Sequence, residues 1–337
     1  MKAIVLKKYT IRDIAKMAGV SPTTISKIMN KTGSISQETT EKVLKIIKET
    51  GYYPTYSAQS LASNKSNLIG IIVDGEYNVD FTHPFFNHVL NSFKNHIGTI
   101  GYDFMFFSNE KFTGEYLERC RHYKVDGCLI ISGDNKDEGC IQLDQSEIPV
   151  VGVDMELSGS NSRYVMTDNR LLAEKVVQHA YLHNISSIGF IGGNQDSYIT
   201  ELRESGFRHA IDRYGLKLKE EWIVYGDFFD RSGYECMKQI LDCDEYPELI
   251  FAASDLMALG AMAAVKERNL SIPEDIRIVG CDDIEASRFS SPTLSTVKQD
   301  KEKIGLLAAY LLSDLIEEKK TARSILVDPI LVVRGSG

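Results

Sequence analysis

The sequence predicts a small three-helix domain at the N-terminus, followed by a larger α/β domain made of two lobes. Two observations lead to this prediction. Residues 1–66 contain eleven basic and four acidic side chains and carry a net charge of +7, whereas the rest of the 337-residue chain carries −16. After residue 67, short apolar runs alternate with amphipathic stretches, which is typical of parallel sheets covered by helices. A basic domain joined to an acidic one favours nucleic-acid binding, although a chance imbalance of surface charge would give the same totals.

The composition argues against a membrane or secreted protein. The chain has no apolar run of roughly eighteen residues, and its first eight residues contain only a short apolar stretch without a small-residue cleavage site. Its six cysteines show neither a CxxC pair nor a zinc-ligand spacing, so we expect reduced thiols rather than disulfides or a metal site. We therefore expect a cytoplasmic protein that needs no cofactor.

Two short helices are predicted within residues 10–29. Apolar residues recur at helical spacing from Ile11 to Ala18, and Thr10 with Asp13 matches the start of a capping box. Gly19 ends the first helix, and Ser21 is a good N-cap for the second. A third helix is expected over residues 37–50, where it closes a small core.

The second helix has the features of a DNA-reading element. In a helix-turn-helix unit this helix enters the major groove, where hydroxyls bond phosphates or base edges and a lysine reaches guanine. An ordinary amphipathic helix pair would explain the periodicity equally well, but not the Gly19-Val20-Ser21 turn beside so many exposed hydroxyls. The residues expected to face outward are Thr23, Thr24, Ser26, Lys27 and Asn30.

These motifs resemble the headpiece of the lactose-repressor (LacI) family. The matching segments are Asp13-Ile14-Ala15, Ala18-Gly19-Val20-Ser21, Thr24-Ile25-Ser26 and Gly51-Tyr52-Tyr53-Pro54. By this resemblance, the bases are contacted by Pro22, Thr23 and Lys27. The phosphates are contacted by Thr10, Ser21, Thr24, Ser26, Asn30, Ser36 and Tyr52. The family usually has arginine at the position of Lys27, and a lysine lacks the planar fork that bonds guanine twice. The resemblance places the headpiece at residues 8–66, with the helix-turn-helix at about residues 10–29.

The segment after the headpiece is a polar linker with one weak helical turn, which needs a partner to persist in water. The family resemblance implies a hinge helix at about residues 56–63 that orders on operator DNA beside its dimer mate. Ala58 belongs to this helix, and Leu61 is the apolar wedge that enters a minor-groove step. The alternative is that Leu61 makes an ordinary contact with the body of the protein.

The body, residues 67–337, contains too many predicted strands for one sheet of usual size, and the pattern restarts after Asp168. We therefore expect two similar lobes, the first at about residues 68–165 and 296–325, the second at about residues 166–293 and 327–334. The expected strands are residues 68–73, 102–107, 126–131, 149–154, 164–167, 187–192, 249–253 and 276–280. Ligands in such folds lie outside the carboxyl ends of the strands, which places a site between the lobes.

Side chains at the predicted strand ends and helix starts suit a polyol. Carboxylates and an arginine bond hydroxyl groups, and aromatic rings such as those of His83-Pro84-Phe85-Phe86 stack on the apolar face of a sugar. Each position also has a structural alternative, such as a helix cap for Asp168 or Asp255 and a core ring for Phe228. The candidate effector-binding residues are Phe85, Asp168, Arg203, Phe228, Ser254, Asp255 and Asp282.

The resemblance to the LacI family extends over residues 9–334 and includes Val279-Gly280-Cys281-Asp282-Asp283. It implies a periplasmic-binding-protein-like effector domain, a homodimer without the family's tetramerising helix, and Arg203 and Asp282 as the foremost effector contacts. Two positions depart from the family pattern. Ser254 stands where asparagine is common, and Cys281 replaces the usual aromatic residue. The identity of the effector therefore does not transfer from the family.

Together these features predict a homodimeric, non-enzymatic repressor of carbohydrate-utilisation genes, whose affinity for double-stranded operator DNA depends on a sugar. The alternative effectors are a phosphocarrier protein and a non-sugar ligand such as a purine or nucleoside. A sugar-binding transport protein would share the two lobes but not the basic headpiece. An enzyme is disfavoured because the glycines of Gly189-Phe190-Ile191-Gly192-Gly193 lack nucleotide-loop spacing, and the sequence has no G-x-S-x-G or HExxH motif.

Overall fold

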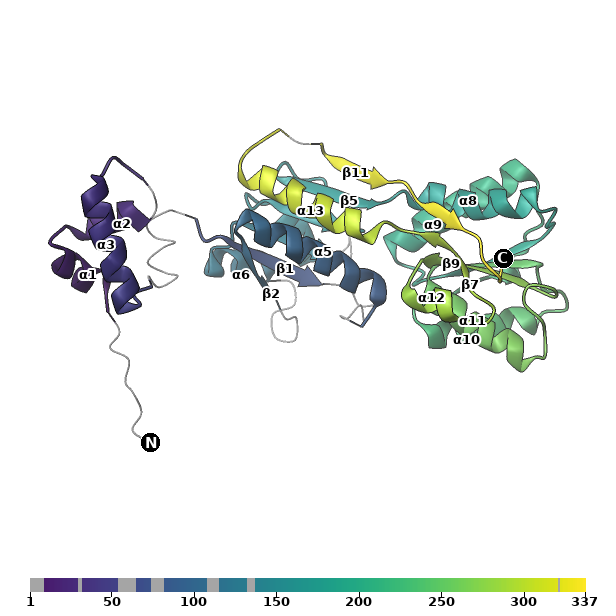
Figure 1. The fold of residues 1–337 in the computed structure, drawn as a ribbon. Helices are drawn as coiled ribbons and strands as arrows, with labels where there is room; N and C mark the ends of the chain where they lie inside the picture. The colour runs from purple at the N-terminus through teal and green to yellow at the C-terminus, as the bar shows by residue number, and fades with distance from the viewer. Residues whose placement is uncertain are drawn as a thin grey trace. The chain divides into compact units, whose positions relative to one another are not determined.

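The computed structural model describes residues 9–29, 32–53, 65–73, 82–107, 115–131, 137–320 and 322–337. The chain divides into two compact units, Met1–Asn67 and Leu68–Gly337 (Figure 1). The first unit is helical and the second contains two sheets with helices, which confirms the predicted fold class. Among the described residues, no helix is long and apolar enough to span a membrane.

The N-terminal unit contains helices α1 (Ile11–Ala18), α2 (Pro22–Met29) and α3 (Gln37–Thr50). The capping box predicted for α1 is present. The backbone N–H of Asp13 donates to the Thr10 hydroxyl at 3.3 Å, and the Thr10 N–H donates to the Asp13 carboxylate at 2.8 Å. Two of the four orphan N–H groups at this helix end are thereby satisfied.

The turn between α1 and α2 depends on Gly19. Its φ is 71°, a left-handed conformation that side chains disfavour, and its N–H closes α1 by donating to the carbonyl of Ala15. The turn lets the three helices share one apolar core, whose buried members are Ile14, Ala15, Ala18, Ile25, Ile28, Val43 and Tyr52.

The first lobe of the larger unit is a six-stranded parallel sheet in the order β11-β5-β4-β3-β1-β2. The central strands β3 and β4 are buried along their whole length, as their continuous apolar sequences predict. Helices α5 and α13 pack together against this lobe (Figure 1). The strands are β1 (Leu68–Val73), β2 (Asp103–Phe106), β3 (Gly127–Ile131), β4 (Val150–Val153), β5 (Ser162–Thr167) and β11 (Ser324–Val327), and the helices are α5 (Pro84–Ile100), α6 (Tyr116–Tyr123), α7 (Glu138–Asp144) and α13 (Lys301–Ile316).

The second lobe repeats this plan, with strands in the order β12-β10-β9-β8-β6-β7. All neighbouring strands are parallel except β10 and β12. Helix α8 packs on α9, and α10 packs on α11. The strands are β6 (Ile188–Gly192), β7 (Ile223–Tyr225), β8 (Leu249–Ala252), β9 (Arg277–Asp282), β10 (Ser295–Lys298) and β12 (Ile330–Val332), and the helices are α8 (Asn169–Leu182), α9 (Tyr198–Tyr214), α10 (Asp230–Leu241), α11 (Asp255–Glu267) and α12 (Glu285–Phe289).

The chain passes between the lobes after β5, between β10 and α13, and between β11 and β12. The structure differs from the prediction at one boundary between the lobes. Residues 296–298 were expected in the first lobe, but they pair with β9 in the second, and the chain crosses only at about Gln299. Strand β7 was not predicted, because three residues are too few to show a period.

Candidate effector site and DNA-binding face

A cavity lies between the two lobes, at the carboxyl ends of the parallel strands. It encloses about 400 Å³, including its opening to solvent. Asp154 follows β4, Ala253 follows β8, Asp282 ends β9 and Gln299 follows β10. Both lobes therefore contribute to one site, in the place that the parallel topology predicts. The lining residues are His83, Phe85, Phe86, Asp154, Ser197, Ile199, Arg203, Phe228, Ala253, Ser254, Asp282 and Gln299.

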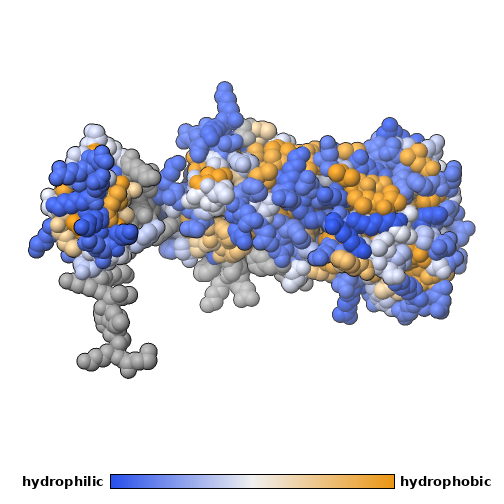
Figure 2. All heavy atoms as spheres, in the orientation of Figure 1, coloured by the Kyte–Doolittle hydropathy of each residue, from blue (hydrophilic) through white to orange (hydrophobic). Residues whose placement is uncertain are grey.

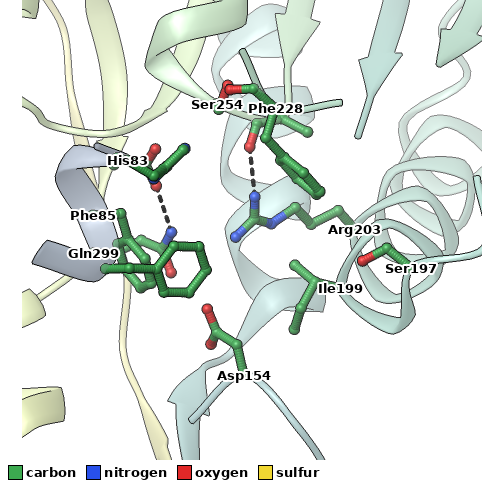
Figure 3. A pocket seen from close by; sticks show the side chains of 12 residues that line it. His83, Phe85, Asp154, Ser197, Ile199, Arg203, Phe228, Ser254 and Gln299 are labelled. Carbon is green, nitrogen blue, oxygen red and sulfur yellow. Dashed lines mark hydrogen bonds between the residues drawn. The ribbon is translucent and has the colours of Figure 1, made fainter. Parts of the chain in front are cut away.

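Five of the seven predicted effector residues line this cavity: Phe85, Arg203, Phe228, Ser254 and Asp282. They are far apart in the sequence and come from both lobes. Figure 3 shows Asp154, Arg203 and Phe228 pointing toward one central space.

Among the residues that the structure describes, Arg203 is the only arginine that lines the cavity, and this residue is 3% exposed. Its Nε donates to Oδ1 of Asn169 at 2.8 Å. Its Nη1 donates to the carbonyl of Ala253 at 2.5 Å (Figure 3). Asn169 is held in turn by a bond from its Nδ2 to the carbonyl of Thr167 at 2.9 Å. The positive group is thus fixed in orientation before any ligand arrives, which lowers the entropy cost of binding.

Two buried carboxylates face the same space. Gln299 Nε2 donates to Oδ1 of Asp282 at 2.7 Å. Among the described residues, no group donates to Oδ2 of Asp282 or to Oδ1 of Asp154, and Oε1 of Gln299 likewise has no donor. Burial raises the pKa of Asp154 to about 7, opposed by the charge of Arg203 and reinforced by that of Asp282. Three buried acceptor oxygens are therefore open to a ligand that donates hydrogen bonds.

The backbone at these positions is unusual. Asp154, Phe228 and Asp282 have φ values of 55°, 71° and 122°, in a region that residues other than glycine rarely adopt. Such strained positions cluster at functional sites because the surrounding structure must hold them. Three of the cavity's lining residues share this feature, which supports a functional role for the cavity.

The ring of Phe228 depends on Gly193. A Cβ atom at Gly193 would lie 2.0 Å from Cζ of Phe228, so only glycine leaves room for the ring. Ser254 fixes the same segment, because its hydroxyl donates to the carbonyl of Phe228 at 2.8 Å and accepts from the N–H of Met257 at 3.0 Å. Gly193, directly after β6, therefore has a packing role that is unrelated to nucleotide binding.

Asp168 does not line the cavity. Its Oδ1 accepts from the N–H of Leu171 at 3.0 Å, so it is the N-cap of α8. This is the structural alternative that the sequence had left open.

Asp255 also lies outside the cavity lining and is fully buried. Its carboxylate accepts from the hydroxyls of Thr296 at 2.5 Å and Ser287 at 2.6 Å, and from the N–H of Ile284 at 2.9 Å. Burial and the charge of Asp282 raise its pKa to about 7, against the lowering effect of these bonds. Asp255 therefore joins α11 to α12 and β10 rather than facing a ligand.

Several lining residues were not predicted. Asp154 and Gln299 each follow a strand, so the reasoning from strand ends would have reached them. Ser197 and Ile199 flank the start of α9, but nothing in their residue types marks a site. Ala253 contributes mainly its carbonyl, which no side-chain pattern reveals.

The face of the N-terminal unit that was predicted to bind DNA is accessible. Thr10, Ser21, Pro22, Thr23, Lys27 and Ser36 are exposed, and Thr24 and Ser26 are half-buried. Tyr52 differs, because its side chain is only 8% exposed and packs in the helical core. Asn30, Ala58 and Leu61 lie outside the described residues, so the predictions for them stay predictions.

The hydroxyls on this face also begin the helices. The N–H of Thr24 donates to the Ser21 hydroxyl at 3.1 Å, and the N–H of Thr39 donates to the Ser36 hydroxyl at 3.4 Å. The outer face of α3 carries Lys42, Lys45 and Lys48. Figure 2 shows hydrophilic residues beside apolar patches on the visible side of this unit.

The structure gives no sign of a metal centre in the ranges that it describes, where no group of three His, Cys, Asp or Glu side chains is suited to an ion. The six cysteines are free thiols, and all except Cys243 are buried.

Comparisons with known proteins agree with this architecture. Residues 10–55 match the family model described as bacterial regulatory proteins, lacI family, and residues 177–337 match that of the periplasmic binding protein-like domain. The chain is 34% identical over 333 residues to the HTH-type transcriptional repressor PurR of Pasteurella multocida (strain Pm70), covering 97% of this chain and 98% of that protein. The repressor of the same name from Haemophilus influenzae (strain PittEE) is 34% identical over 338 residues, with the same coverage.

Solved structures show the same fold. The lac repressor dimer bound to operator and the anti-inducer ONPF has a TM-score of 0.87 and 25% identity, covering 98% of this chain and 99% of that one. The transcriptional regulator CelR–cellobiose complex has a TM-score of 0.75 and 28% identity, covering 98% and 100%. Its two domains and its full-length similarity to named repressors show that the chain belongs to the LacI family of DNA-binding transcriptional repressors.

Proposed function

We propose that this repressor binds operator DNA as a homodimer in the cytoplasm and that a small ligand in the cavity between the lobes sets its affinity for the operator. The observation that carries this proposal is the preorganised Arg203, which is fixed by Asn169 and Ala253. It lies beside three buried acceptor oxygens that receive no hydrogen bond from the part of the chain that the structure describes. Buried polar groups left unpaired cost free energy, and a ligand that pairs them recovers it.

For the ligand we favour a purine base or nucleoside over the sugar that the sequence suggested. The full-length relatives at 34% identity are named PurR, a name for purine-responsive repressors. The cavity is lined by Phe85, Phe86 and Phe228, and a planar base stacks well on such rings. Ring N–H or amino groups of the base would donate to Asp154, Asp282 or Gln299.

A sugar is the second candidate, because the CelR structure is a complex with cellobiose. Paired carboxylates and an arginine bind hydroxyl groups as well as they bind a base, and aromatic rings stack on the apolar face of a sugar. The lining residues alone therefore suit both classes.

The proposed DNA contacts are those of the exposed face of the headpiece. Lys27 and Thr23 on α2 face outward and would meet base edges, while Thr10, Ser21 and Ser36 lie at helix starts, where N–H groups and hydroxyls suit phosphates. For Tyr52, only the hydroxyl could reach a phosphate, because the ring is in the core.

The proposed mechanism joins the two functions through lobe closure. Ligand binding shifts the cleft further toward its closed state and rotates the first lobes of the dimer relative to each other. That movement changes the spacing of the hinge segments at Ala58 and Leu61 and thereby the fit of the headpieces to DNA. The coupling free energy of such switches is typically about 1–3 kcal/mol.

A calorimetric titration panel tests the choice of ligand. Guanine, hypoxanthine, adenosine and guanosine form one arm, and mono- and disaccharides including cellobiose form the other, with a phosphorylated carrier protein as a third. Saturable binding of a purine that also shifts operator affinity supports the proposal. Binding confined to a sugar would establish the second candidate, and binding of the carrier alone would overturn both.

A further inference from the structure

A carboxylate beside the cavity connects the two lobes. Glu156 lies two residues after Asp154, in the loop that follows β4 of the first lobe. The hydroxyl of Tyr198, the first residue of α9 in the second lobe, donates to Oε2 of Glu156. Tyr198 stands between Ser197 and Ile199, which both line the cavity. This hydrogen bond therefore spans the cleft next to the site itself.

The same carboxylate makes a matching bond within its own lobe. The hydroxyl of Tyr164, on β5, donates to Oε1 of Glu156 at 3.3 Å. One carboxylate thus accepts two tyrosine hydroxyls, but only the bond from Tyr198 must break when the lobes separate. Burial and the negative charge of Glu156 raise the pKa of Tyr198 above its usual value, so its hydroxyl stays a donor at neutral pH.

A second contact between the lobes lies elsewhere on the cavity. The rings of His83 and Phe229 meet edge to face, with centroids 5.5 Å apart and planes at 87°. His83 lines the cavity and Phe229 follows Phe228. Figure 3 shows His83 and Ser197 at separate edges of the cavity, so the ring contact and the hydrogen bond hold different parts of the cleft.

We propose that Glu156 and Tyr198 are positioning residues that keep the cleft closed over the effector. The Glu156–Tyr198 hydrogen bond forms only when the two lobes approach, so it stabilises the closed state and slows effector release. This inference rests on the proposed function of the cavity. Because hydrogen bonds to charged groups stabilise by more than neutral ones, we expect its loss to speed release about tenfold. The ring contact remains in that case, so binding itself persists.

The test compares Tyr198→Phe with Tyr164→Phe in the full-length protein. Both variants remove one hydroxyl from Glu156 and keep the ring, but only the first breaks the bond between the lobes. Stopped-flow release of guanine, guanosine or cellobiose, whichever binds, measures the rate of dissociation. We expect about a tenfold faster release and an unchanged association rate for Tyr198→Phe, and less than about a twofold change for Tyr164→Phe.

A second readout needs no ligand. Hydrogen–deuterium exchange of the unliganded protein should accelerate at residues 154–158 and 196–200 in Tyr198→Phe, and not in Tyr164→Phe. If no purine or sugar of the titration panel binds, the proposed ligand classes fail, while the exchange data still decide whether the bond holds the lobes. Equal release and equal exchange in the two variants would overturn the inference. Adding Glu156→Ala to Tyr198→Phe should accelerate effector release by less than Glu156→Ala does in the wild type, because the two side chains act through one hydrogen bond.

Discussion

Nε of Arg203 donates to Oδ1 of Asn169 at 2.8 Å, and this bond joins α9 to the first turn of α8. The same guanidinium reaches the carbonyl of Ala253 at the end of β8. One side chain therefore ties three segments of the second lobe together and presents a fixed positive charge to the cavity. The ligand-binding role proposed for Arg203 follows from this relationship.

Replacing Arg203 by alanine should weaken effector binding about 10–100-fold, because a charged hydrogen bond contributes about 1.5–3 kcal/mol. Calorimetry of the ligand found in the titration panel measures the change. The control is Arg170→Ala, which removes an exposed arginine that bonds Ser205 outside the cavity. Full effector affinity in folded Arg203→Ala would show that the ligand binds elsewhere.

Effector affinity should rise with pH between about 6 and 8. The pKa of Asp154 is raised to about 7, so part of the carboxyl is protonated at neutral pH, with Arg203 and Asp282 as the charged groups that face it. A ligand that donates to Asp154 favours the ionised form, so binding lowers the pKa and releases a proton.

The affinity cannot change over this pH range by more than about tenfold for each unit by which the ligand lowers the pKa of Asp154. Titrations in buffers of different ionisation enthalpy count the protons released. Asp154→Asn should flatten the profile, which separates Asp154 from Asp255, whose pKa is also about 7. A profile that falls with pH in the wild type would contradict the assignment of Asp154 as an acceptor.

Asp255→Ala should destabilise the second lobe by about 3 kcal/mol, because the donors of Ile284, Ser287 and Thr296 lose their acceptor inside the core. Urea unfolding measures the loss. Asp168→Ala, which removes only a helix cap, should cost about 1 kcal/mol. If Asp255→Ala unfolds like the wild type but no longer binds effector, then the original prediction of a ligand contact was right.

Gly193→Ala should reduce effector affinity about tenfold, the effect expected when a stacking ring is displaced. The new methyl group would overlap the Phe228 ring, which must leave the cavity. The matched control is Gly98→Ala, on an exposed helix position where a Cβ meets nothing within 4 Å. That change should leave binding intact and slightly favour the helix. Equal binding by the two variants would rule out a role for the Phe228 ring.

Lys27→Ala should weaken operator binding about tenfold and relax the base preference at the position that Lys27 reads, because a lost base contact costs about 1–3 kcal/mol. Fluorescence anisotropy with the operator duplex, and with duplexes that differ from it by one base pair, measures both quantities. Lys45→Ala is the control, since Lys45 lies on α3 and pairs with Glu49. An unchanged affinity together with an unchanged base preference in Lys27→Ala would contradict a role for Lys27 in base recognition.

The helical unit was predictable almost residue by residue, because caps and turns are local. Thr10, Asp13 and Gly19 act on neighbours within a few residues, and they are the residue types that a helix cap and a left-handed turn prefer. The position of the cavity was also predictable, since parallel strands end at one edge.

The assignment of individual carboxylates was less reliable. Asp154, Asp168, Asp255 and Asp282 all stand at strand ends or helix starts, yet only Asp154 and Asp282 line the cavity. The difference for Asp255 comes from Thr296, a partner 41 residues away that turns the carboxylate inward. Hydrogen bonds between residues so far apart produce no periodic pattern in a single sequence.

The most direct test of the account is the affinity of the full-length protein for a duplex from the promoter upstream of its own gene, measured at low salt with and without each ligand that binds. The account predicts specific binding, a change of about 5–150-fold on adding the ligand, and loss of that response in Arg203→Ala, which should still bind the duplex. Specific binding that no cavity ligand alters, or a response that survives in Arg203→Ala, would contradict it.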